Sequence, residues 1–328
     1  MDWGKKKVLV TGAAGFIGSH LTDELVKLGA CVRAFVHYNA SGSWGSLDRA
    51  FVQKNDIEVI AGDICDPMIV KEAMGDVNTV FHLAALIAIP YSYHAPLSYI
   101  RTNIEGTLNI LQAAREARVS RVVHTSTSEV YGTALYAPID EKHPLQGQSP
   151  YSASKIGADQ VAESFHRSYE LPVVTVRPFN TFGPRQSARA IIPTIIAQCL
   201  SGKEVCLGSL APTRDLNYVR NTVDGYIRAA ECPEAIGQTF NLGSGREISI
   251  GELVKVIARM TDCKIQIKQD DRRLRPEKSE VGRLIADSTK ARNMLGWVPA
   301  VSLEDGLSAT IEWMRGNLDK YNAAEYTL

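Results

Sequence analysis

Tyr151 and Lys155 are four residues apart in a segment with a helical pattern, Tyr151-Ser-Ala-Ser-Lys155. That spacing places a phenol and an ammonium group on one face of a helix. A nearby ammonium favours the phenolate and lowers the tyrosine pKa, so Tyr151 could take a proton from a hydroxyl group. The pair alone is common on exposed helices. Its meaning depends on the segments around it.

A glycine-rich turn follows the apolar residues 8–10 and opens a helical segment. Glycines in such a turn allow a tight bend, close approach of backbone N–H groups to a pyrophosphate, and close packing of the helix on the strand. The strand and the helix both stand where this mechanism requires them. The turn therefore predicts a dinucleotide site that includes Gly12, Gly15, Phe16, Ile17 and Gly18.

The end of the second predicted strand leaves the choice of dinucleotide open. An acidic residue there would bind the ribose hydroxyls of NAD. His37 and Asn39 stand there instead: His37 with Arg33 could attract the 2′-phosphate of NADP, whereas Asn39 could bind the ribose. Ligands bind at the carboxyl ends of strands in open α/β sheets. The third and fourth strands therefore add Asp63, Ile64, Leu83, Ala84 and Ala85 to the predicted cofactor site.

The segments that must position these residues alternate between apolar runs and amphipathic stretches. Strand-like runs cover residues 7–11, 32–37, 57–61, 79–84 and 121–126, and helix-like stretches cover 17–28 and 104–117. Continuous apolar runs indicate strands covered on both faces, as in a parallel sheet with crossover helices. The sequence therefore predicts a doubly wound α/β fold.

Beyond about residue 177 the alternation loosens, and a short strand at 264–268 follows a helix at 250–261. This change predicts a smaller C-terminal α/β domain that binds the substrate. We place the dinucleotide-binding domain at 1–176 plus about 213–243, with 239–242 returning to the main sheet, and the second domain at about 177–212 and 244–328.

The composition excludes several classes of protein. The 36 basic residues balance 36 acidic ones, which argues against a nucleic-acid-binding surface. No window approaches the length of apolar sequence that a membrane helix needs. The six cysteines form no C-x-x-C pair or Cys/His cluster, so we expect no metal site and reduced thiols in a cytoplasmic protein.

In its ordered motifs the chain resembles an extended short-chain dehydrogenase/reductase of the nucleotide-sugar epimerase/dehydratase family. The resemblance extends from Val8 to Pro299 and adds to the glycine turn and the Tyr/Lys pair the motifs at residues 82–85, 103–107, 126–132, 177–185 and 213–215. It implies a Rossmann fold, a role for Asn103 in holding the active-site helix, and a homodimer formed through the helices at 103–117 and 151–168.

Within this family the reaction depends on the residues beside Thr127. Epimerases lack an acidic residue there, whereas 4,6-dehydratases have Thr-Asp-Glu or Thr-Ser-Glu, as in Thr127-Ser128-Glu129. The resemblance implies that Tyr151, with Thr127 and Lys155, promotes oxidation at carbon 4 of a sugar. Glu129 then removes the carbon 5 proton, and either Ser128 or Glu129 protonates the departing water before hydride returns to carbon 6.

The resemblance also implies a substrate site and its alternatives. It places Asn180, Arg185, Arg214 and Arg275 near the substrate diphosphate. The segments 87–93 and 209–212 and Trp44 are similar to those of bacterial UDP-N-acetylglucosamine 4,6-dehydratases of the legionaminic-acid type, which implies a UDP-N-acetyl sugar. A UDP-sugar 4-epimerase, a UDP-glucuronate decarboxylase, which shares Thr-Ser-Glu, and a non-catalytic dinucleotide sensor stay open. The intact Tyr151–Lys155 pair argues against the sensor.

Overall fold

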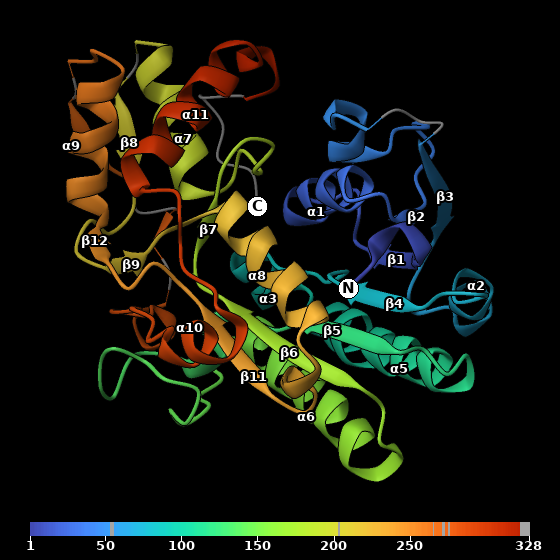
Figure 1. Cartoon of the computed structure of the whole chain (residues 1–328). Coiled ribbons are helices and arrows are strands. Elements are labelled where there is room, and N and C mark those ends of the chain that lie inside the picture. Colours follow the sequence, from blue (N-terminus) through green and yellow to red (C-terminus); the bar gives the residue numbers. More distant parts are fainter. Residues whose placement is uncertain (53–55, 203, 265, 271–272, 275, 322–328) are drawn as a thin grey trace.

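A seven-stranded parallel sheet forms the centre of the protein (Figure 1). The computed structural model describes residues 1–52, 56–202, 204–264, 266–270, 273–274 and 276–321. The strand order is β11-β6-β5-β4-β1-β2-β3. The strands are β1 (Lys7–Thr11), β2 (Cys31–His37), β3 (Ile57–Gly62), β4 (Thr79–His82), β5 (Arg121–Thr125), β6 (Val173–Pro178) and β11 (Thr239–Leu242). The central strands are buried along nearly their whole length, as continuous apolar runs predict.

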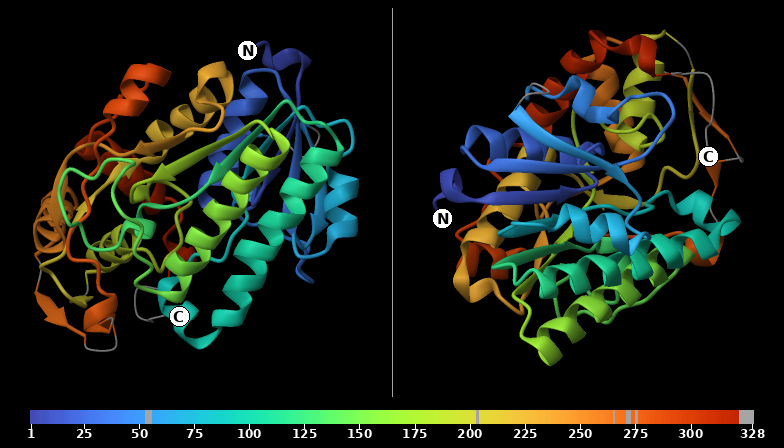
Figure 2. Two further views of the ribbon diagram at one scale, coloured as in Figure 1. Left: turned by 90° about the horizontal axis from the view of Figure 1, so that it is seen from below. Right: turned by 90° about the vertical axis from the view of Figure 1, so that its right-hand side faces the viewer.

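Helices cover both faces of this sheet (Figures 1 and 2). One face packs on α1 (Phe16–Lys27) and α8 (Val219–Glu231), and the other on α2 (Pro67–Ala73), α5 (Gly106–Glu116) and α6 (Pro150–Tyr169). Helices α5 and α6 lie side by side below the sheet in Figure 1. The doubly wound α/β fold is therefore confirmed.

Local sequence explains where the functional helix α6 begins. Ser149 caps it: the Ser149 Oγ accepts from the Ser152 N–H at 3.1 Å, and the Ser152 hydroxyl accepts from the Ser149 N–H at 3.0 Å. Pro150 occupies the first helical position, where its missing N–H costs nothing. Tyr151 therefore lies in the first turn of α6, at the carboxyl edge of the sheet.

A second group of elements packs beside the carboxyl edge, at the upper left of Figure 1. Its helices are α7 (Ile191–Leu200), α9 (Ile250–Met260) and α11 (Leu303–Arg315), with α10 (Thr289–Leu295) closer to β11. Its short strands pair as β7 (Thr181–Phe182) with β10 (Asn217–Tyr218), β8 (Val205–Leu207) with β13 (Ile267–Gln269), and β9 (Thr213–Asp215) with β12 (Glu247–Ser249). Buried residues of α7, α9 and α11 share one core cluster with β1 and α1.

Several predicted boundaries shift. Strand β11 joins the main sheet beside β6, as predicted for 239–242. The strand predicted at 264–268 is observed at 267–269, and residue 265 lies outside the described residues. The helix predicted from residue 104 is preceded by α3 (Ile89–His94), α4 (Pro96–Tyr99) and a π-helical turn, Ile100–Glu105, which places Asn103 one turn before α5.

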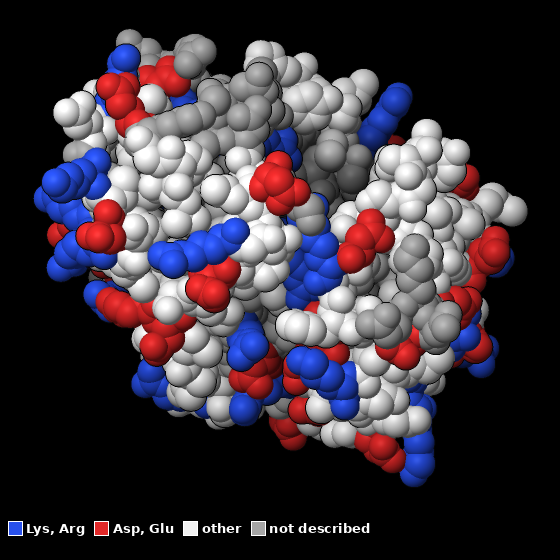
Figure 3. Space-filling view, turned by 90° about the horizontal axis from the view of Figure 1, so that it is seen from above, with Lys and Arg blue, Asp and Glu red and all other residues white. Residues whose placement is uncertain are grey.

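Three observations concern membrane helices, metal ligands and surface charge. Among the described residues no helix is both long and apolar enough to cross a bilayer. The same part of the chain contains no group of three or more potential metal ligands. On the face drawn in Figure 3, Lys and Arg are interspersed with Asp and Glu and form no continuous stripe of one sign.

Candidate active site

The glycine turn leaves room for an anion at the start of α1. A side chain at Gly12 would place its Cβ 2.8 Å from the Ala84 nitrogen, and the φ of Gly12 is +71°. A Cβ at Gly18 would lie 2.2 Å from the Gly12 oxygen. Gly15, the N-cap of α1, provides no side-chain cap for the N–H groups of the first turn. These N–H groups and the positive end of the helix dipole suit a pyrophosphate, so the residues fit the predicted dinucleotide.

The residues predicted for the ribose end lie near one another. His37 Nε2 is 3.8 Å from Asp63 Oδ2, so a carboxylate faces the end of β2 although β2 itself carries none. The Asn39 amide donates to the Ser43 carbonyl at 2.7 Å and thereby closes its own loop. Sequence analysis predicted both residues for the cofactor site but did not pair Asp63 with His37. Both strands end at one edge of a parallel sheet, and that is the signal that could have found the pair.

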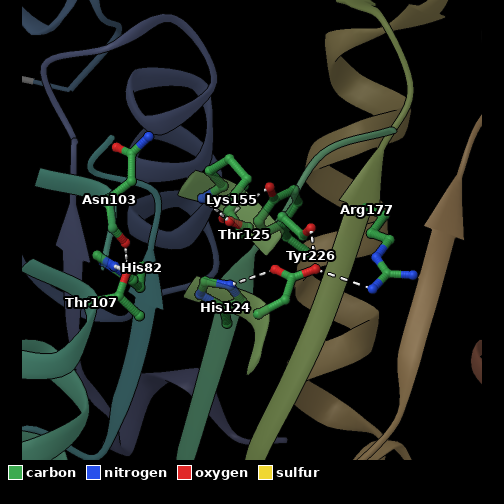
Figure 4. A network of polar contacts seen from close by, with 10 residues as sticks. His82, Asn103, Thr107, His124, Thr125, Lys155, Arg177 and Tyr226 are labelled. Atoms are coloured by element: carbon green, nitrogen blue, oxygen red, sulfur yellow. Dashed lines mark hydrogen bonds and ion pairs between the residues drawn. The ribbon is translucent and has the colours of Figure 1, made fainter. Parts of the chain in front are cut away.

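A chain of buried hydrogen bonds connects Thr11, directly before the glycine turn, to β4 and α5. Figure 4 shows the part of this chain between His82 and Thr107. Thr11 Oγ1 lies 2.8 Å from His82 Nδ1 and accepts from the Leu83 and Ala84 N–H groups at 3.1 and 3.2 Å. His82 Nε2 lies 2.9 Å from the Thr107 hydroxyl. This network fixes Leu83 and Ala84 beside the turn, where the sequence predicted cofactor contacts.

Asn103 holds two segments together, as the resemblance implied. Its Oδ1 accepts from the Leu86 N–H at 2.8 Å, and its Nδ2 donates to the Leu86 carbonyl at 3.0 Å and to the Ser154 hydroxyl at 2.8 Å. Ser154 in turn donates to the Tyr151 carbonyl at 2.7 Å. The first turn of α6 is therefore anchored to the loop after β4. Ile64, also predicted at the cofactor site, is buried against Gly106.

Tyr151 is buried, and its hydroxyl forms a side-chain hydrogen bond with Thr127. Burial raises the pKa of Tyr151 above its ordinary value, and the Thr127 hydrogen bond acts in the opposite direction. The predicted lowering of this pKa by Lys155 is therefore wrong for this structure. The physical reason is desolvation, which disfavours the phenolate.

Lys155 points at the end of β5. Its Nζ donates to the Thr125 carbonyl at 2.6 Å, and burial lowers the pKa of Lys155 to about 8. The Thr125 hydroxyl accepts from Tyr226 of α8 at 3.0 Å (Figure 4). The Lys155 ammonium is therefore held at the end of β5, and its residue lies one helical turn after Tyr151 on α6.

Thr127, Ser128 and Glu129 follow β5 and enter a short 3₁₀ turn, Ser128–Tyr131. The Thr127 hydroxyl accepts from the Glu129 N–H at 3.2 Å and caps this turn. Ser128 is buried, whereas Glu129 is partly exposed. The Glu129 carboxylate is close enough to raise the pKa of Tyr151. The structure thus brings the predicted catalytic residues of β5 and α6 together.

A further buried carboxylate, Asp159, was absent from the predicted site. It lies four residues after Lys155 on α6 and binds side chains from β5 and from Arg177 of β6. Arg177 also donates to the Tyr131 hydroxyl at 3.0 Å. An acidic residue at helical spacing from Lys155 is the signal that sequence reasoning could have used.

Two of the arginines predicted for the substrate diphosphate have acidic partners within the chain. Arg185 is buried, and its Nη2 lies 2.8 Å from Asp23 Oδ2 of α1, so the structure gives it an internal partner instead. Arg214 forms an ion pair with Glu280 at 2.9 Å. The Asn180 Oδ1 is buried without a hydrogen-bond partner, which suits a residue that awaits a ligand. Arg275 lies outside the described residues.

The comparisons with known proteins agree with this geometry. The family model for GDP-mannose 4,6 dehydratase matches residues 9–310. The dTDP-D-glucose 4,6-dehydratase of Homo sapiens is 30% identical over 331 residues, covering 98% of this chain and 94% of the relative. The UDP-glucose 4-epimerase of Mycolicibacterium smegmatis is 34% identical over 316 residues, covering 94% of this chain and 98% of the relative.

Solved structures are similar over the same length. The dTDP-glucose 4,6-dehydratase DesIV from Streptomyces venezuelae, with NAD and TYD bound, matches with a TM-score of 0.88 at 30% identity. The match covers 96% of this chain and 99% of that chain. Similarity therefore extends over the whole sheet and the elements beside its carboxyl edge.

Proposed function

Because the chain belongs to the NAD-dependent epimerase/dehydratase family of short-chain dehydrogenases/reductases, we propose that it is a nucleotide-sugar 4,6-dehydratase. Family membership alone leaves the reaction undecided, since dehydratases and an epimerase match at similar identity. The observation that carries the proposal is Glu129, a partly exposed carboxylate beside Thr127 and within electrostatic reach of Tyr151. An elimination needs such a base, whereas epimerisation at carbon 4 does not.

We propose NAD as the cofactor. Gly12, Gly15, Phe16, Ile17 and Gly18 would hold its pyrophosphate through backbone N–H groups. NAD is favoured over NADP because the Asp63 carboxylate lies near His37, where it would repel a 2′-phosphate. When bound, the cofactor supplies an acceptor for hydride and later the donor that returns it, so the cycle has no net redox change.

The first step that the chain's own residues perform is proton removal from the hydroxyl at carbon 4. Tyr151 is the base, and the Thr127 hydroxyl stabilises the phenolate that must form, because its hydrogen bond lowers the Tyr151 pKa. Lys155, held on the Thr125 carbonyl, places a positive charge one turn away. The buried position of Tyr151 excludes water from this step.

Elimination follows from the ketone at carbon 4, which makes the proton at carbon 5 acidic. Glu129 would remove this proton while the hydroxyl at carbon 6 departs as water. Either Glu129 carries the same proton to the departing hydroxyl, or Ser128, its buried neighbour in the turn, relays it. Once hydride has returned to carbon 6, carbon 5 takes a proton from solvent, and Tyr151 releases the proton that it removed from the carbon 4 hydroxyl. The chain then regains its starting protonation state.

For the substrate we propose UDP-N-acetylglucosamine, on the resemblance of residues 87–93 and 209–212 and of Trp44. Arg214 is proposed to contact its diphosphate through its guanidinium, and Asn180 is proposed to contact it through its Nδ2 donor, because the family resemblance places both residues there. The unpartnered Asn180 Oδ1 would be left for a donor group of the substrate. The relatives include a dTDP-D-glucose 4,6-dehydratase as well, so dTDP-glucose is the main competitor.

We further propose that the chain works in the cytoplasm as a homodimer formed through α5, α6 and the turn before α5. Ile100, Leu108 and Tyr169 expose 44%, 43% and 52% of their surface there, which is apolar area that a partner could cover. Sedimentation at low concentration tests this part: a monomer would contradict it.

The decisive experiment is a substrate panel read by mass spectrometry. The purified protein with NAD receives UDP-N-acetylglucosamine, dTDP-glucose, GDP-mannose and UDP-glucuronate in deuterated water. A dehydratase gives a product that has lost one water and carries deuterium at carbon 5. An unchanged sugar composition with inverted stereochemistry would make the protein an epimerase instead, and carbon dioxide loss from UDP-glucuronate would make it a decarboxylase.

Glu129→Gln tests the assigned base. The variant should stop water loss by about 10²-fold or more while NAD reduction by the substrate is still detected in absorbance, because only the second step needs the carboxylate. Glu163→Gln is the matched control, since Glu163 is an exposed carboxylate on α6 that forms an ion pair with Arg167 of the same helix. Continued dehydration by Glu129→Gln would remove Glu129 from the mechanism.

A further inference from the structure

Asp159 is a buried carboxylate that no step above uses. It is 4% exposed and lies one helical turn after Lys155 on α6. Its Oδ1 accepts from His124 Nε2 at 3.0 Å, and its Oδ2 accepts from Ser126 Oγ at 2.7 Å and from Arg177 Nη2 at 3.1 Å. Figure 4 shows His124 and Arg177 approaching the same point from β5 and β6. Burying an ionised carboxylate costs desolvation free energy, and Asp159 stays ionised because these hydrogen bonds and the Arg177 charge stabilise it.

The partners of Asp159 lie on either side of the carbonyl that holds the catalytic lysine. His124 of β5 and Ser126, directly after β5, flank Thr125, and the Thr125 carbonyl accepts from Lys155 Nζ at 2.6 Å. By binding both flanking residues, Asp159 fixes the end of β5 against α6. The carbonyl that receives the ammonium is therefore held from the same helix that carries Lys155.

Ser126 also begins the segment that carries the proposed catalytic groups. The next residue is Thr127, which bonds Tyr151, and Glu129 follows two positions later. The Ser126–Asp159 hydrogen bond, at 2.7 Å, is thus a direct tie between this segment and α6. Its loss would let Thr127 and Glu129, which follow β5, move relative to Tyr151.

The charges around Lys155 also depend on Asp159. The titratable groups that interact with Lys155 are Asp159 on α6, His82 on β4 and His124 on β5. Beyond them, Arg177 of β6 binds Asp159, Tyr226 of α8 binds Thr125, and Tyr151 lies one turn before Lys155 on α6. Burial lowers the pKa of both histidines, so they are neutral at neutral pH. Burial also raises the pKa values of Tyr151 and Tyr226, which are neutral as well. Asp159 is the negative charge among these described groups, and its pKa is lowered to about 2.

We propose that Asp159 is a positioning residue for the reaction: it is the buried counter-charge that keeps Lys155 an ammonium on the Thr125 carbonyl, and it ties the segment that begins at Ser126 to the helix that carries Tyr151. The inference rests on the proposed function only for its kinetic consequence. The charge on Lys155 can be measured without any substrate.

The sign of the effect follows from the charges. Burial lowers the pKa of Lys155 to about 8, and Asp159 acts against that lowering. In Asp159→Asn the opposing charge is lost at nearly constant volume, so the pKa of Lys155 should fall by about one unit or more. In Arg177→Met the carboxylate loses its cationic partner, so the pKa of Lys155 should rise. Opposite shifts from two variants of one cluster are not expected of general structural damage.

The experiment is an NMR titration of protein labelled with ¹³C and ¹⁵N in its lysine side chains, with the Lys155 signal assigned by its loss in Lys155→Met. Wild type, Asp159→Asn, Arg177→Met and His124→Gln are titrated in the absence of sugar. His124→Gln is the matched control, because it exchanges one neutral donor to Asp159 for another and should leave the midpoint within a few tenths of a unit of wild type.

A Lys155 midpoint unchanged in Asp159→Asn, or lowered equally in all three variants, would overturn the inference. If Asp159→Asn does not fold, the rise in Arg177→Met decides it, and no rise there also overturns it. In the kinetic arm, the limb of the pH–kcat profile that needs the ammonium should move to lower pH in Asp159→Asn. If no sugar of the panel is turned over, the proposed function fails while the titration still judges the inference.

Discussion

Gly18→Ala is expected to displace the glycine turn by a distance that the structure defines. The added Cβ would lie 2.2 Å from the Gly12 oxygen, 2.9 Å from the Gly12 carbonyl carbon and 3.0 Å from the Ala13 Cα. All three atoms belong to the backbone, so no side chain can rotate away. Since carbon contacts are favourable only from about 3.5 Å, the turn must retreat by roughly 1 Å. Gly18 lies inside α1 without a positive φ, so sterics alone cause the effect.

Two opposing terms set the stability of this variant. Overpacking costs about 1–3 kcal/mol, and replacing a helical glycine by alanine returns about 1 kcal/mol. The free energy of unfolding should therefore fall by about 0–2 kcal/mol. NAD binding should suffer more, because a shift of roughly 1 Å removes at least one backbone hydrogen bond to a charged pyrophosphate, worth about 1.5–3 kcal/mol. The Kd should rise by about 10- to 100-fold.

Calorimetric NAD titration and chemical denaturation measure the two quantities separately. Gly251→Ala is the matched control, because Gly251 also lies in a first helical turn, that of α9, and its added Cβ would come no closer than 3.6 Å to the Leu210 oxygen. That control should bind NAD like wild type and be as stable or slightly more stable. Wild-type NAD affinity in Gly18→Ala would refute the assignment of this turn to the pyrophosphate.

Two other contacts give predictions of their own. The Ser279 hydroxyl donates its own proton to the Gln148 carbonyl, just before α6. The Tyr93 hydroxyl is therefore the donor in its 2.6 Å hydrogen bond to Ser279 Oγ. Tyr93→Phe should raise KM for the sugar about two- to tenfold with little change in kcat, as loss of one neutral hydrogen bond implies. The control Tyr91→Phe should change neither KM nor kcat. Equal kinetics for the two variants would contradict a role of the Tyr93 hydroxyl in substrate binding. Arg185→Met should lower the free energy of unfolding by about 3–5 kcal/mol in denaturant titrations, because Asp23 is left buried and unpaired, and adding Asp23→Asn should recover part of it. A loss below 1 kcal/mol would refute the buried-pair reasoning.

Periodicity predicted the sheet well because each strand is buried on both faces. Lys7–Thr11 was located to the residue, and α1 and β2 to within one residue at each end. The turn before α5 was missed, because a π-helical segment at Ile100–Glu105 has no period that a 3.6-residue pattern detects. The division of the chain into two domains stays a prediction.

The catalytic segment was predictable because its residues are close in sequence and carry the motif themselves. The Arg185 partner was not, because Asp23 is 162 residues away and its charge pattern on α1 is that of any surface helix. The Tyr151 pKa was assigned the wrong sign for a related reason. Spacing reports which groups are neighbours, whereas desolvation depends on every segment that packs over them.

Overall neutrality can be reconciled with a dianionic substrate through these internal pairs. The described arginines of the predicted substrate site have acidic neighbours, since Arg185 pairs with Asp23 and Arg214 with Glu280. An incoming diphosphate must therefore compete with the Glu280 carboxylate for Arg214, and the net gain in Coulomb energy is smaller than a free guanidinium would give. Neutral hydrogen-bond donors then contribute a larger share of the binding free energy. Backbone N–H groups need no counter-charge when the site is empty of anion, so a chain that relies on them can bind a dianion without a basic surface.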